Sequence, residues 1–406
     1  MLTGTNLTYT KTYNYRIVFE TIRLYGPISR ADIARFTALT AQTVSNITKR
    51  LLDNQLIREG QKKQEGRGAP SLTLEINPEG SYSIGLDFNR DHITGVLVDL
   101  SGNMKGRQYV ELDTIPGPDE AIKLMARTIE DLLRSQNLTQ NELDGVGIGF
   151  PGPIELKGSG TVTNTVNPKS FPEWEHVPVV KMLSNYVDVP IYLGNNASVA
   201  AVGENWYGAG QHISNFLYVF FGAGLGSGLI INGQYFEGHS SNAGEIGYFP
   251  FMAGSSPLIS SDQPHIGEHF NLSRLYQWLN SKGVEINRPA DLETLYYEEN
   301  PHLREWLDQA IEILTPAFLT VEYLIDPQVI FLGGRLPFVL FTDICQNVTN
   351  KMPKSRIKGK ESGPELRCGT AGIDAAALGA ATLPMFELFA PEHQLLIKRN
   401  KKEALS

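Results

Sequence analysis

Five polar side chains occupy the outer face of one short amphipathic stretch near the N-terminus. Residues 41–52 place Val44, Ile47, Leu51 and Leu52 on one side of a helix, which leaves hydroxyls, amides and one amine on the other side. Groups of this size and kind hydrogen-bond to base edges and phosphates in a major groove. We therefore expect nucleic-acid contacts from Thr40, the helix N-cap, and from Gln42, Thr43, Ser45, Asn46 and Lys49.

Two more helices are expected in front of this one. Residues 15–24 have mostly helical spacing and stop at Gly26-Pro27. Ser29 and Asp32 form a capping-box-like start for a helix over residues 31–36. A short turn then separates that helix from the polar one, which is the order of a helix-turn-helix.

A basic, glycine-rich tip follows the three helices. Residues 57–70 carry the cations Lys62, Lys63 and Arg67 and lead into a strand over residues 72–76. This pattern predicts a hairpin, or wing, that brings cations to phosphates or to a minor groove. Residues 1–80 are thus predicted to form a winged helix-turn-helix; a small helical protein-interaction domain is the alternative.

Composition and charge agree with a folded protein of several domains. The chain has 406 residues, of which 41% are hydrophobic and 19% charged, and only two are cysteines. No apolar run approaches the ~18 residues that cross a bilayer, so we expect a cytoplasmic protein with no membrane partner. Residues 1–80 hold 11 Lys and Arg against 7 Asp and Glu, a net charge of +4, whereas the remainder carries −13. A basic head on an acidic body suits DNA contacts confined to one module, although ordinary scatter of surface charge is the alternative.

The rest of the chain contains one pattern twice. Residues 83–88 lead through a polar turn into a strand over 93–100, and residues 216–221 lead through a glycine-rich loop over 222–228 into a strand over 229–234. Helical stretches follow both units, which predicts two similar α/β lobes with a cleft between them. The predicted divisions are the head at 1–80, the first lobe at 81–195, the second lobe at 196–385 and a C-terminal tail at 386–406.

Six motifs occur in an order that resembles the ROK family of repressors, open reading frames and kinases. They are Gly149-Phe150-Pro151-Gly152-Pro153, Asn195-Asn196-Ala197, the run from Gly222 to Gly228, Gly244-Glu245-Ile246-Gly247-Tyr248, the run from Asp326 to Gly334, and the run from Ala376 to Ala381. The resemblance implies a duplicated actin-like (ribonuclease H-like) ATPase fold. Members with a winged helix in front resemble repressors of sugar-utilisation genes, of the xylose, N-acetylglucosamine and glucose regulator type, whereas members without it are typically sugar kinases.

The sequence departs from the family's kinases at three points. The Asn-Asp pair that supplies their catalytic base reads Asn195-Asn196, and an amide cannot take a hydroxyl proton near neutral pH. The first phosphate loop, from Asp87 to Asp91, lacks the family's glycine and threonine, and Asp91 adds a charge that repels phosphate. The second loop, Gly222-Ala223-Gly224, lacks the threonine hydroxyl. We expect no kinase activity and no cofactor.

The family's zinc site is also altered. Tyr248 stands where the family has a histidine ligand, and residues 249–268 contain no cysteine. His265 and His269 lie near that position in the sequence, but two imidazoles without thiolates are more typical of surface or pocket histidines. We expect no metal.

The positions that hold a sugar in the family keep polar residues. Asn195 and Asn196 can donate and accept hydrogen bonds, Glu245 matches a carboxylate that accepts from sugar hydroxyls, and Tyr248 could hydrogen-bond to the ring or stack on it. The alternatives are that the two asparagines cap a helix over 197–206 and that Glu245 is an ordinary surface carboxylate. The expected effector-binding residues are Gly152, Asn167, Asn195, Asn196, Glu245, Tyr248 and Glu268, of which Glu268 has the weakest local match.

Taken with the resemblance, these features predict a sugar-responsive regulator that binds double-stranded operator DNA and represses carbohydrate-utilisation genes. A sugar or sugar phosphate would close the cleft between the lobes and change the spacing of the two heads in a homodimer or homotetramer. One alternative is a sugar kinase that also binds DNA. Another is a regulator with a vestigial pocket whose signal is a protein that docks on the body.

Overall fold

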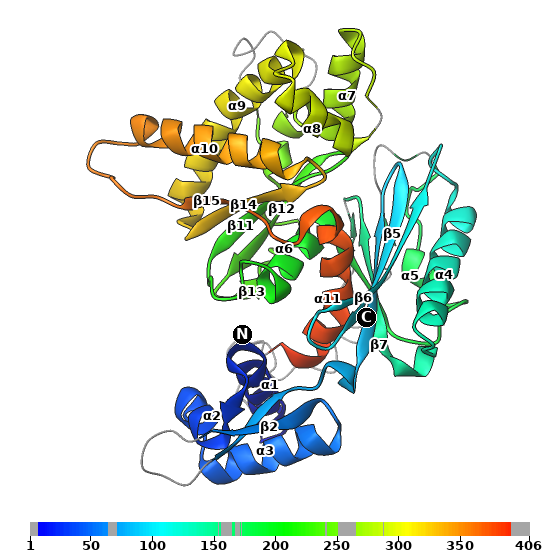
Figure 1. The fold of residues 1–406 in the computed structure, drawn as a ribbon, viewed down its shortest axis with the longest axis vertical. Helices are drawn as coiled ribbons and strands as arrows, with labels where there is room; N and C mark the ends of the chain where they lie inside the picture. Colours follow the sequence, from blue (N-terminus) through cyan, green and yellow to red (C-terminus); the bar gives the residue numbers. More distant parts are fainter. Residues whose placement is uncertain are drawn as a thin grey trace.

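The computed structural model describes residues 7–63, 71–152, 154–155, 165–166, 171, 173–239, 242–250, 265–286 and 288–390. These residues form an N-terminal head and two α/β lobes, with two helices between the lobes (Figure 1). The lobes stand beside each other, and the head lies at one end of the molecule.

Three helices and a three-stranded antiparallel sheet make up the head. Both expected N-caps are confirmed, because Ser29 Oγ accepts a hydrogen bond from the backbone N of Asp32 and Thr40 Oγ1 accepts one from that of Thr43, each at 3.2 Å. The first helix begins at Leu7 rather than at residue 15, because its first turns lack an apolar stripe that periodicity could detect. The elements are α1 Leu7–Tyr25, β1 Ile28–Ser29, α2 Arg30–Thr37, α3 Ala41–Asp53, β2 Ile57–Lys63 and β3 Ser71–Ile76, and the sheet order is β1-β3-β2.

The first lobe is built on a five-stranded sheet in the order β10-β7-β4-β5-β6. Strands β4, β5 and β6 form an antiparallel meander, and β7 and β10 run parallel to β4. Helices α4 and α5 cover the outer face of this sheet (Figure 1). The bounds are β4 Tyr82–Phe88, β5 His92–Asp99, β6 Met104–Glu111, α4 Pro118–Ser135, β7 Leu143–Phe150, α5 Val179–Leu183 and β10 Ile191–Asn195, with a small pair formed by β8 Ile154–Glu155 and β9 Thr165–Val166.

The second lobe repeats this topology, in the sheet order β13-β12-β11-β14-β15. Strands β11, β12 and β13 are antiparallel, and β14 and β15 run parallel to β11 on its other side. The predicted duplication is therefore confirmed. The bounds are β11 Phe216–Phe221, β12 Leu225–Ile231, β13 Gln234–Tyr235, α7 Leu272–Ser281, α8 Pro289–Tyr297, α9 Pro301–Ile325, β14 Val329–Gly334, α10 Phe338–Ser355 and β15 Glu365–Cys368.

The glycine-rich loop of this lobe is shorter than predicted, because β12 already begins at Leu225. Gly226 and Gly228 lie in the strand, where a helix packs closely on it. A Cβ atom on Gly226 would lie 2.7 Å from the Cβ of Ala197, and one on Gly228 would lie 2.6 Å from the Cβ of Ala201. These glycines serve close packing between helix and sheet, which is a different role from binding phosphate.

Helices α6 Asn196–Tyr207 and α11 Ala375–Phe389 lie between the two sheets (Figure 1). α6 packs on β12, and α11 packs on β4 and β7 of the first lobe, where a Cβ on Gly85 would collide with the backbone of Ala377. Helix α11 thus packs on the sheet of the first lobe and continues past residue 385 to Phe389, and the division of the chain at 196 and 386 stays a prediction. Residues 372–389 are the one described stretch long and apolar enough to span a bilayer, but 56% of it is buried, as in a core helix.

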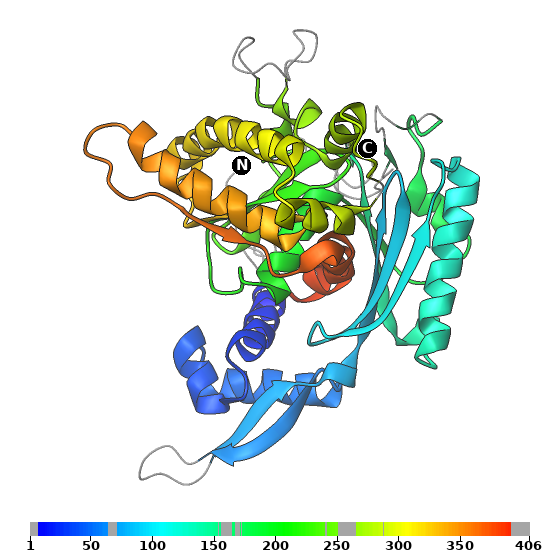
Figure 2. The same ribbon diagram turned by 45° about the horizontal axis from the view of Figure 1, so that its top comes forward.

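The head is docked on these two central helices through α1. The ring of Phe19 stacks on Phe389 of α11 at 4.3 Å, and Arg16 Nη1 donates to the carbonyl of Ala390 at 2.8 Å. Arg23 reaches Trp206 at the end of α6. Figure 2 shows α1 running from the head into the body. The core of the head and part of the core of the body thus form one continuous apolar cluster.

Candidate functional site

Asn195 and Asn196 lie where β10 ends and α6 begins, and their side chains play different parts. Asn195 Oδ1 accepts a hydrogen bond from the backbone N of Ala197 at 2.9 Å, so Asn195 is the N-cap of α6. Its Nδ2 lies 3.5 Å from Glu245 Oε1. Asn196 does not cap the helix, and its Nδ2 donates to Asp87 Oδ1 at 3.4 Å. The capping alternative therefore holds for Asn195 alone.

Glu245 faces this pair from the second lobe. Its side chain is partly buried, and burial raises the pKa of its carboxyl group from 4.5 to about 7. Gly152 approaches from the first lobe, because a Cβ on that glycine would lie 2.4 Å from Asn195 Nδ2. The structure thus brings three expected positions, Gly152, Asn195 and Glu245, against one another.

Tyr248 and Glu268 lie on two short 3-10 helices that pack together, η3 Ile246–Tyr248 and η4 Ile266–Glu268. The ring of Tyr248 is half exposed and meets the ring of His265 edge-on at 5.7 Å. Burial, and then the charges of Glu245 and Glu268, raise the pKa of the Tyr248 hydroxyl. Glu245, Tyr248 and Glu268 are therefore close enough to interact electrostatically, and Tyr248 and Glu268 are open to solvent.

Two expected contacts, Asn167 and Arg67, lie outside the described residues. The segments that follow Gly152 and Tyr248 in the sequence also lie outside them in large part. Two described surface cavities, of about 300 and 320 Å³, lie elsewhere, one between head and body and one between α9 and α10. Among the described residues no group of three or more His, Cys, Asp or Glu side chains is placed to hold a metal ion, so the absence of zinc stays a prediction.

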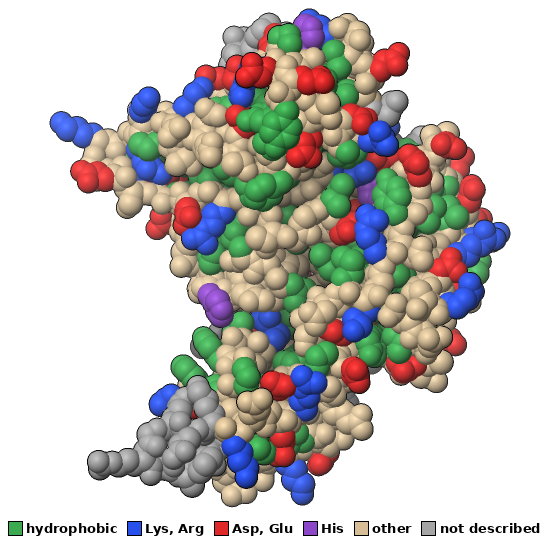
Figure 3. Space-filling view, in the orientation of Figure 1, with side chains coloured by type: hydrophobic (Ala, Val, Ile, Leu, Met, Phe, Trp, Pro, Cys, Tyr) green, Lys and Arg blue, Asp and Glu red, His purple; other side chains and the backbone are tan. Residues whose placement is uncertain are grey.

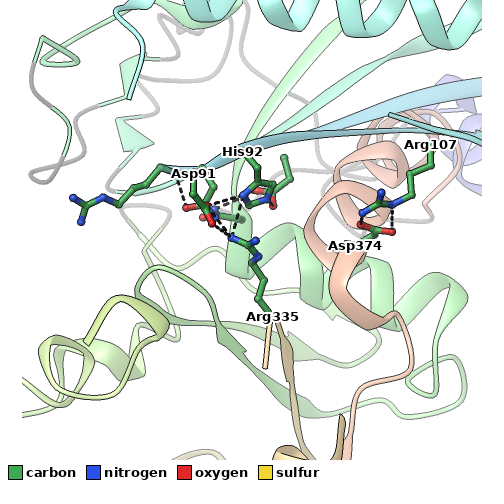
Figure 4. A network of polar contacts seen from close by, with 9 residues as sticks. Asp91, His92, Arg107, Arg335 and Asp374 are labelled. Atoms are coloured by element: carbon green, nitrogen blue, oxygen red, sulfur yellow. Dashed lines mark hydrogen bonds and ion pairs between the residues drawn. The ribbon is translucent and has the colours of Figure 1, made fainter. Parts of the chain in front are cut away.

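A network of charged groups joins the two lobes beside this site (Figure 4). Arg335, just after β14, places Nη1 2.8 and 2.7 Å from the two carboxylate oxygens of Asp91, in the loop between β4 and β5. His92 Nδ1 lies 2.8 Å from Asp91, and its Nε2 lies 3.3 Å from Asp87. Asp91, expected to repel phosphate, is instead one half of an ion pair between the lobes.

The contacts within the network shift the pKa values of His92 and Asp91 in opposite directions. Burial by itself lowers the pKa of His92, but hydrogen bonds to Asp87 and Asp91 raise it more, and the result is a pKa above the ordinary 6.5. Burial by itself raises the pKa of Asp91, but the hydrogen bond from His92 and the charge of Arg335 hold it well below its usual range. Asp91 therefore accepts from the Arg335 cation and lies within hydrogen-bond distance of His92 Nδ1.

Asp87, His92 and Arg335 were not singled out as partners from the sequence. Asp87 and His92 lie on neighbouring strands, but Arg335 is more than 240 positions away, and only the packing of the lobes brings it to them. A histidine at the start of the strand-like run 92–99 was the available signal, and it names no partner. The contacts now run without a break from Glu245 through Asn195, Asn196, Asp87 and His92 to Arg335.

The candidate nucleic-acid face is the outer side of α3. Gln42, Ser45, Asn46 and Lys49 are exposed there, and Gln42 Nε2 donates to Asn46 Oδ1 at 3.1 Å. Thr43 is half-buried, and its hydroxyl lies 2.9 Å from that of Thr40. Lys62 is exposed on β2, and Lys63 ends that strand. Figure 3 shows Lys and Arg side chains on the outward surface of the head.

Some curated relatives match nearly the whole chain, and others match about three-fifths of it. A protein of Sinorhizobium fredii, y4fQ, is 25% identical over 93% of this chain and 91% of its own length. The xylose repressor of Caldicellulosiruptor bescii is 32% identical over 60% of each chain, and the N-acetylglucosamine regulator NagC of Escherichia coli is 26% identical over 60% of this chain and 58% of its own. The chain thus matches about three-fifths of the length of these two regulators.

Solved structures share the fold. A ROK family transcriptional regulator, a homologue of the Escherichia coli Mlc protein, has a TM-score of 0.75 over 94% of this chain and 98% of its own, at 19% identity. A ROK glucokinase of Streptomyces griseus has a TM-score of 0.61 over 75% of this chain and 99% of its own, also at 19% identity. The two lobes therefore have the actin-like fold of the ROK sugar kinases. The ROK family profile matches residues 83–385, and the chain belongs to the ROK family.

Proposed function

We propose that this chain is a sugar-responsive DNA-binding regulator, a repressor of carbohydrate-utilisation genes. Its body binds a sugar or sugar phosphate and does not phosphorylate it. The observation that carries the proposal is the pair Asn195-Asn196, which offers amide donors and acceptors at the start of α6 where the family's kinases have a base. The names of the repressor relatives support the same conclusion.

Hydroxyl groups are the ligand chemistry that this site fits. The amide of Asn195 can donate, the carboxyl of Glu245 can accept, and the missing side chain at Gly152 lets the Asn195 amide lie against the backbone of the first lobe. Tyr248 offers a half-exposed ring and a hydroxyl. Asn196 and Glu268 belong to the proposed site, and so does Asn167, which lies outside the described residues.

The head supplies the DNA-binding part of the proposal. We take it to be a winged helix-turn-helix in which α3 enters the major groove and the β2–β3 hairpin is the wing. Polar side chains on the outer face of α3 and the net charge of +4 over residues 1–80 support this assignment. An operator with two half-sites requires two heads at a fixed distance, so we propose a homodimer or homotetramer in which ligand-driven closure of the lobes changes that distance.

Kinase activity is the second candidate, and one observation favours it. The carboxyl of Glu245, with a pKa of about 7, has the proton affinity of a general base. Against it stands the ion pair of Asp91 and Arg335, which fills the first phosphate loop of the family with the protein's own charges. We therefore place the kinase second.

The experiment that tests the proposal has two steps. A DNA duplex selected by the protein from a random library serves as the operator, and fluorescence anisotropy at fixed salt gives its Kd with and without each sugar and sugar phosphate of a panel. We expect one of these ligands to change the operator Kd by about 5- to 150-fold, with no phosphoryl transfer from Mg-ATP to it. If every ligand leaves the operator Kd unchanged, the proposal is wrong.

A Glu245→Ala variant distinguishes the remaining alternatives. A sugar sensor loses its response in this variant and keeps its operator affinity without ligand. A regulator with a vestigial pocket binds no sugar as wild type, and the substitution does not affect its regulation. Release of ADP from Mg-ATP in the presence of a sugar would support the kinase.

The affinity for sugar is expected to depend on pH through Glu245. An ionised carboxylate accepts stronger hydrogen bonds from hydroxyls than a protonated one, so the affinity should rise about fivefold as pH rises through about 7. The folding stability of the protein without sugar changes with pH in the opposite direction. The pKa of Glu245 is raised in the folded protein. The part of the folding stability that comes from its protonated carboxyl is therefore complete below pH 4.5 and is lost as pH rises through about 7. Isothermal titration across this range checks the prediction, and Glu245→Gln should give a flat profile; a flat profile in wild type would contradict it.

A further inference from the structure

Helix α6 has one end in the candidate sugar site and the other end against the head. Asn195 and Asn196 form its beginning, and Trp206 and Tyr207 form its end. Its 12 residues make a rod of about 18 Å. No other described helix begins at the proposed sugar site and ends at the head.

Arg23 of the head contacts the end of α6 with a hydrogen bond and a cation–π contact. Arg23 Nη1 donates to the carbonyl of Trp206 at 2.8 Å, and the guanidinium lies 4.5 Å from the centre of the Trp206 ring. Glu20 fixes the guanidinium from the other side with two hydrogen bonds, of 2.8 and 2.7 Å. The last carbonyls of a helix carry partial negative charge, so a cation placed there by another domain is stabilised by α6 and is sensitive to its position. The Arg23 side chain is only 9% exposed, which limits screening by water.

The body holds α6 as one piece with the segment that leads into α11. The carboxyl group of Glu204 is fully buried and accepts hydrogen bonds from the backbone N atoms of Ala209 at 2.8 Å and Thr370 at 3.0 Å. A Cβ on Gly203 would lie 2.8 Å from Gly379 Cα, so the helices α6 and α11 are in backbone contact. A displacement at the first turn of α6 therefore reaches its last turn instead of being absorbed by loose packing.

Space is present where such a displacement would end. A cavity of about 300 Å³ lies between the head and the body, and Arg23, Trp206, Tyr207 and Arg58 are among its lining residues. This space adjoins Trp206 and Tyr207 in the last turn of α6. The interface between the head and α6 thus has a close contact at Arg23 and a cavity beside that contact.

We propose that α6 transmits occupancy of the sugar site to the head, and that Arg23 is the positioning residue that receives the signal at Trp206. A sugar hydrogen-bonded to Asn195 and Asn196 shifts the first turn of α6, and the helix carries that shift to its last carbonyls. Arg23 follows them and turns α1, and with it α3. This inference rests on the proposed function, because it concerns the coupling of the same sugar site to DNA.

The test measures three quantities for each variant: the Kd for sugar, the Kd for operator, and the Kd for operator with saturating sugar. In Arg23→Gln we expect sugar affinity and sugar-free operator affinity to stay within about threefold of wild type, while the effect of sugar on operator Kd falls to within about twofold of none. Arg16→Gln is the matched control, because Arg16 Nη1 joins the head to the carbonyl of Ala390 at the end of α11. It should keep the wild-type effect of sugar.

A milder variant covers the case in which Arg23→Gln does not fold. Glu20→Gln leaves Arg23 in place and weakens only the group that fixes it, so it should reduce the effect of sugar without abolishing it. Wild-type coupling in both Arg23→Gln and Glu20→Gln, or loss of coupling in Arg16→Gln alone, would overturn the role of α6. Failure of the proposed function looks different, because the wild-type protein itself would then show no effect of sugar on operator Kd.

Discussion

Replacing Phe19 with alanine is expected to release the head from the body and to lower the free energy of unfolding by about 3–5 kcal/mol. Phe19 is buried, and its ring lies flat on that of Phe389, with 4.3 Å between ring centres and 23° between ring planes. Removing the ring leaves a cavity in the apolar cluster that the head shares with α11. The packing around that cavity comes from two domains, so the head can separate from the body rather than collapse around it.

Calorimetry and hydrogen exchange check this result. In wild type we expect the head and the body to unfold together, and in Phe19→Ala the head should unfold in a separate transition at lower temperature. Exchange should accelerate in the second half of α1 and in the last turn of α11. Val44→Ala is the control, because Val44 is buried in the head on α3 and should lower stability without splitting the transition.

Phe389→Ala tests the same contact from the other side. If the two rings stabilise the joint together, the double variant loses about 0.5–1.5 kcal/mol less than the sum of the single variants. Strict additivity, with one unfolding transition in every variant, would mean that the rings are not what holds the head.

The head was predictable from sequence because local patterns determine it. The caps Ser29 and Thr40 and the apolar stripe of α3 are short-range features, and α3 ends at Asp53, one residue after the predicted end. The duplicated lobes were predictable for a related reason, since the strand–turn–strand pattern occurs twice. Local patterns gave no information about how the head and the lobes are joined, because Phe19 and Phe389 lie 370 positions apart and each has an apolar environment that many partners could supply.

The residue types of the candidate site were predictable from the sequence, but their hydrogen-bond and ion-pair partners were not. The resemblance placed Asn195, Asn196 and Glu245 at one candidate site, and in the structure Asn195 lies against Glu245. It did not reveal that Asn196 donates to Asp87 or that Asp91 is neutralised from the other lobe. A charged residue in a loop has the same sequence pattern whether it repels a ligand or pairs with a distant cation, because the partner is chosen by tertiary packing.

The second large effect is expected at the ion pair between the lobes, and it is asymmetric. Asp91→Asn should lower the free energy of unfolding by about 3 kcal/mol, whereas Arg335→Gln should lower it by less than about 1 kcal/mol. The side chain of Arg335 is 6% exposed and that of Asp91 is 52% exposed. Loss of Asp91 therefore leaves a buried cation without its main partner, but loss of Arg335 leaves a carboxylate that keeps His92 and can reach water. Urea unfolding of both variants gives the comparison.

The pH dependence of this effect identifies its source. The folded pKa of His92 is raised, so the stability from its protonated form is complete below the unfolded value of 6.5 and is lost as pH rises above it through the folded pKa. Asp91→Asn removes one of the two carboxyl groups that raise this pKa and should reduce that loss, so the difference between wild type and variant should shrink as pH rises above 6.5. The groups that face His92 are Asp87, Asp91, Arg335 and the stacked ring of Tyr109. A cost below about 1 kcal/mol for both Asp91→Asn and Arg335→Gln at every pH would show that solvent screens this ion pair and that it does not hold the lobes together.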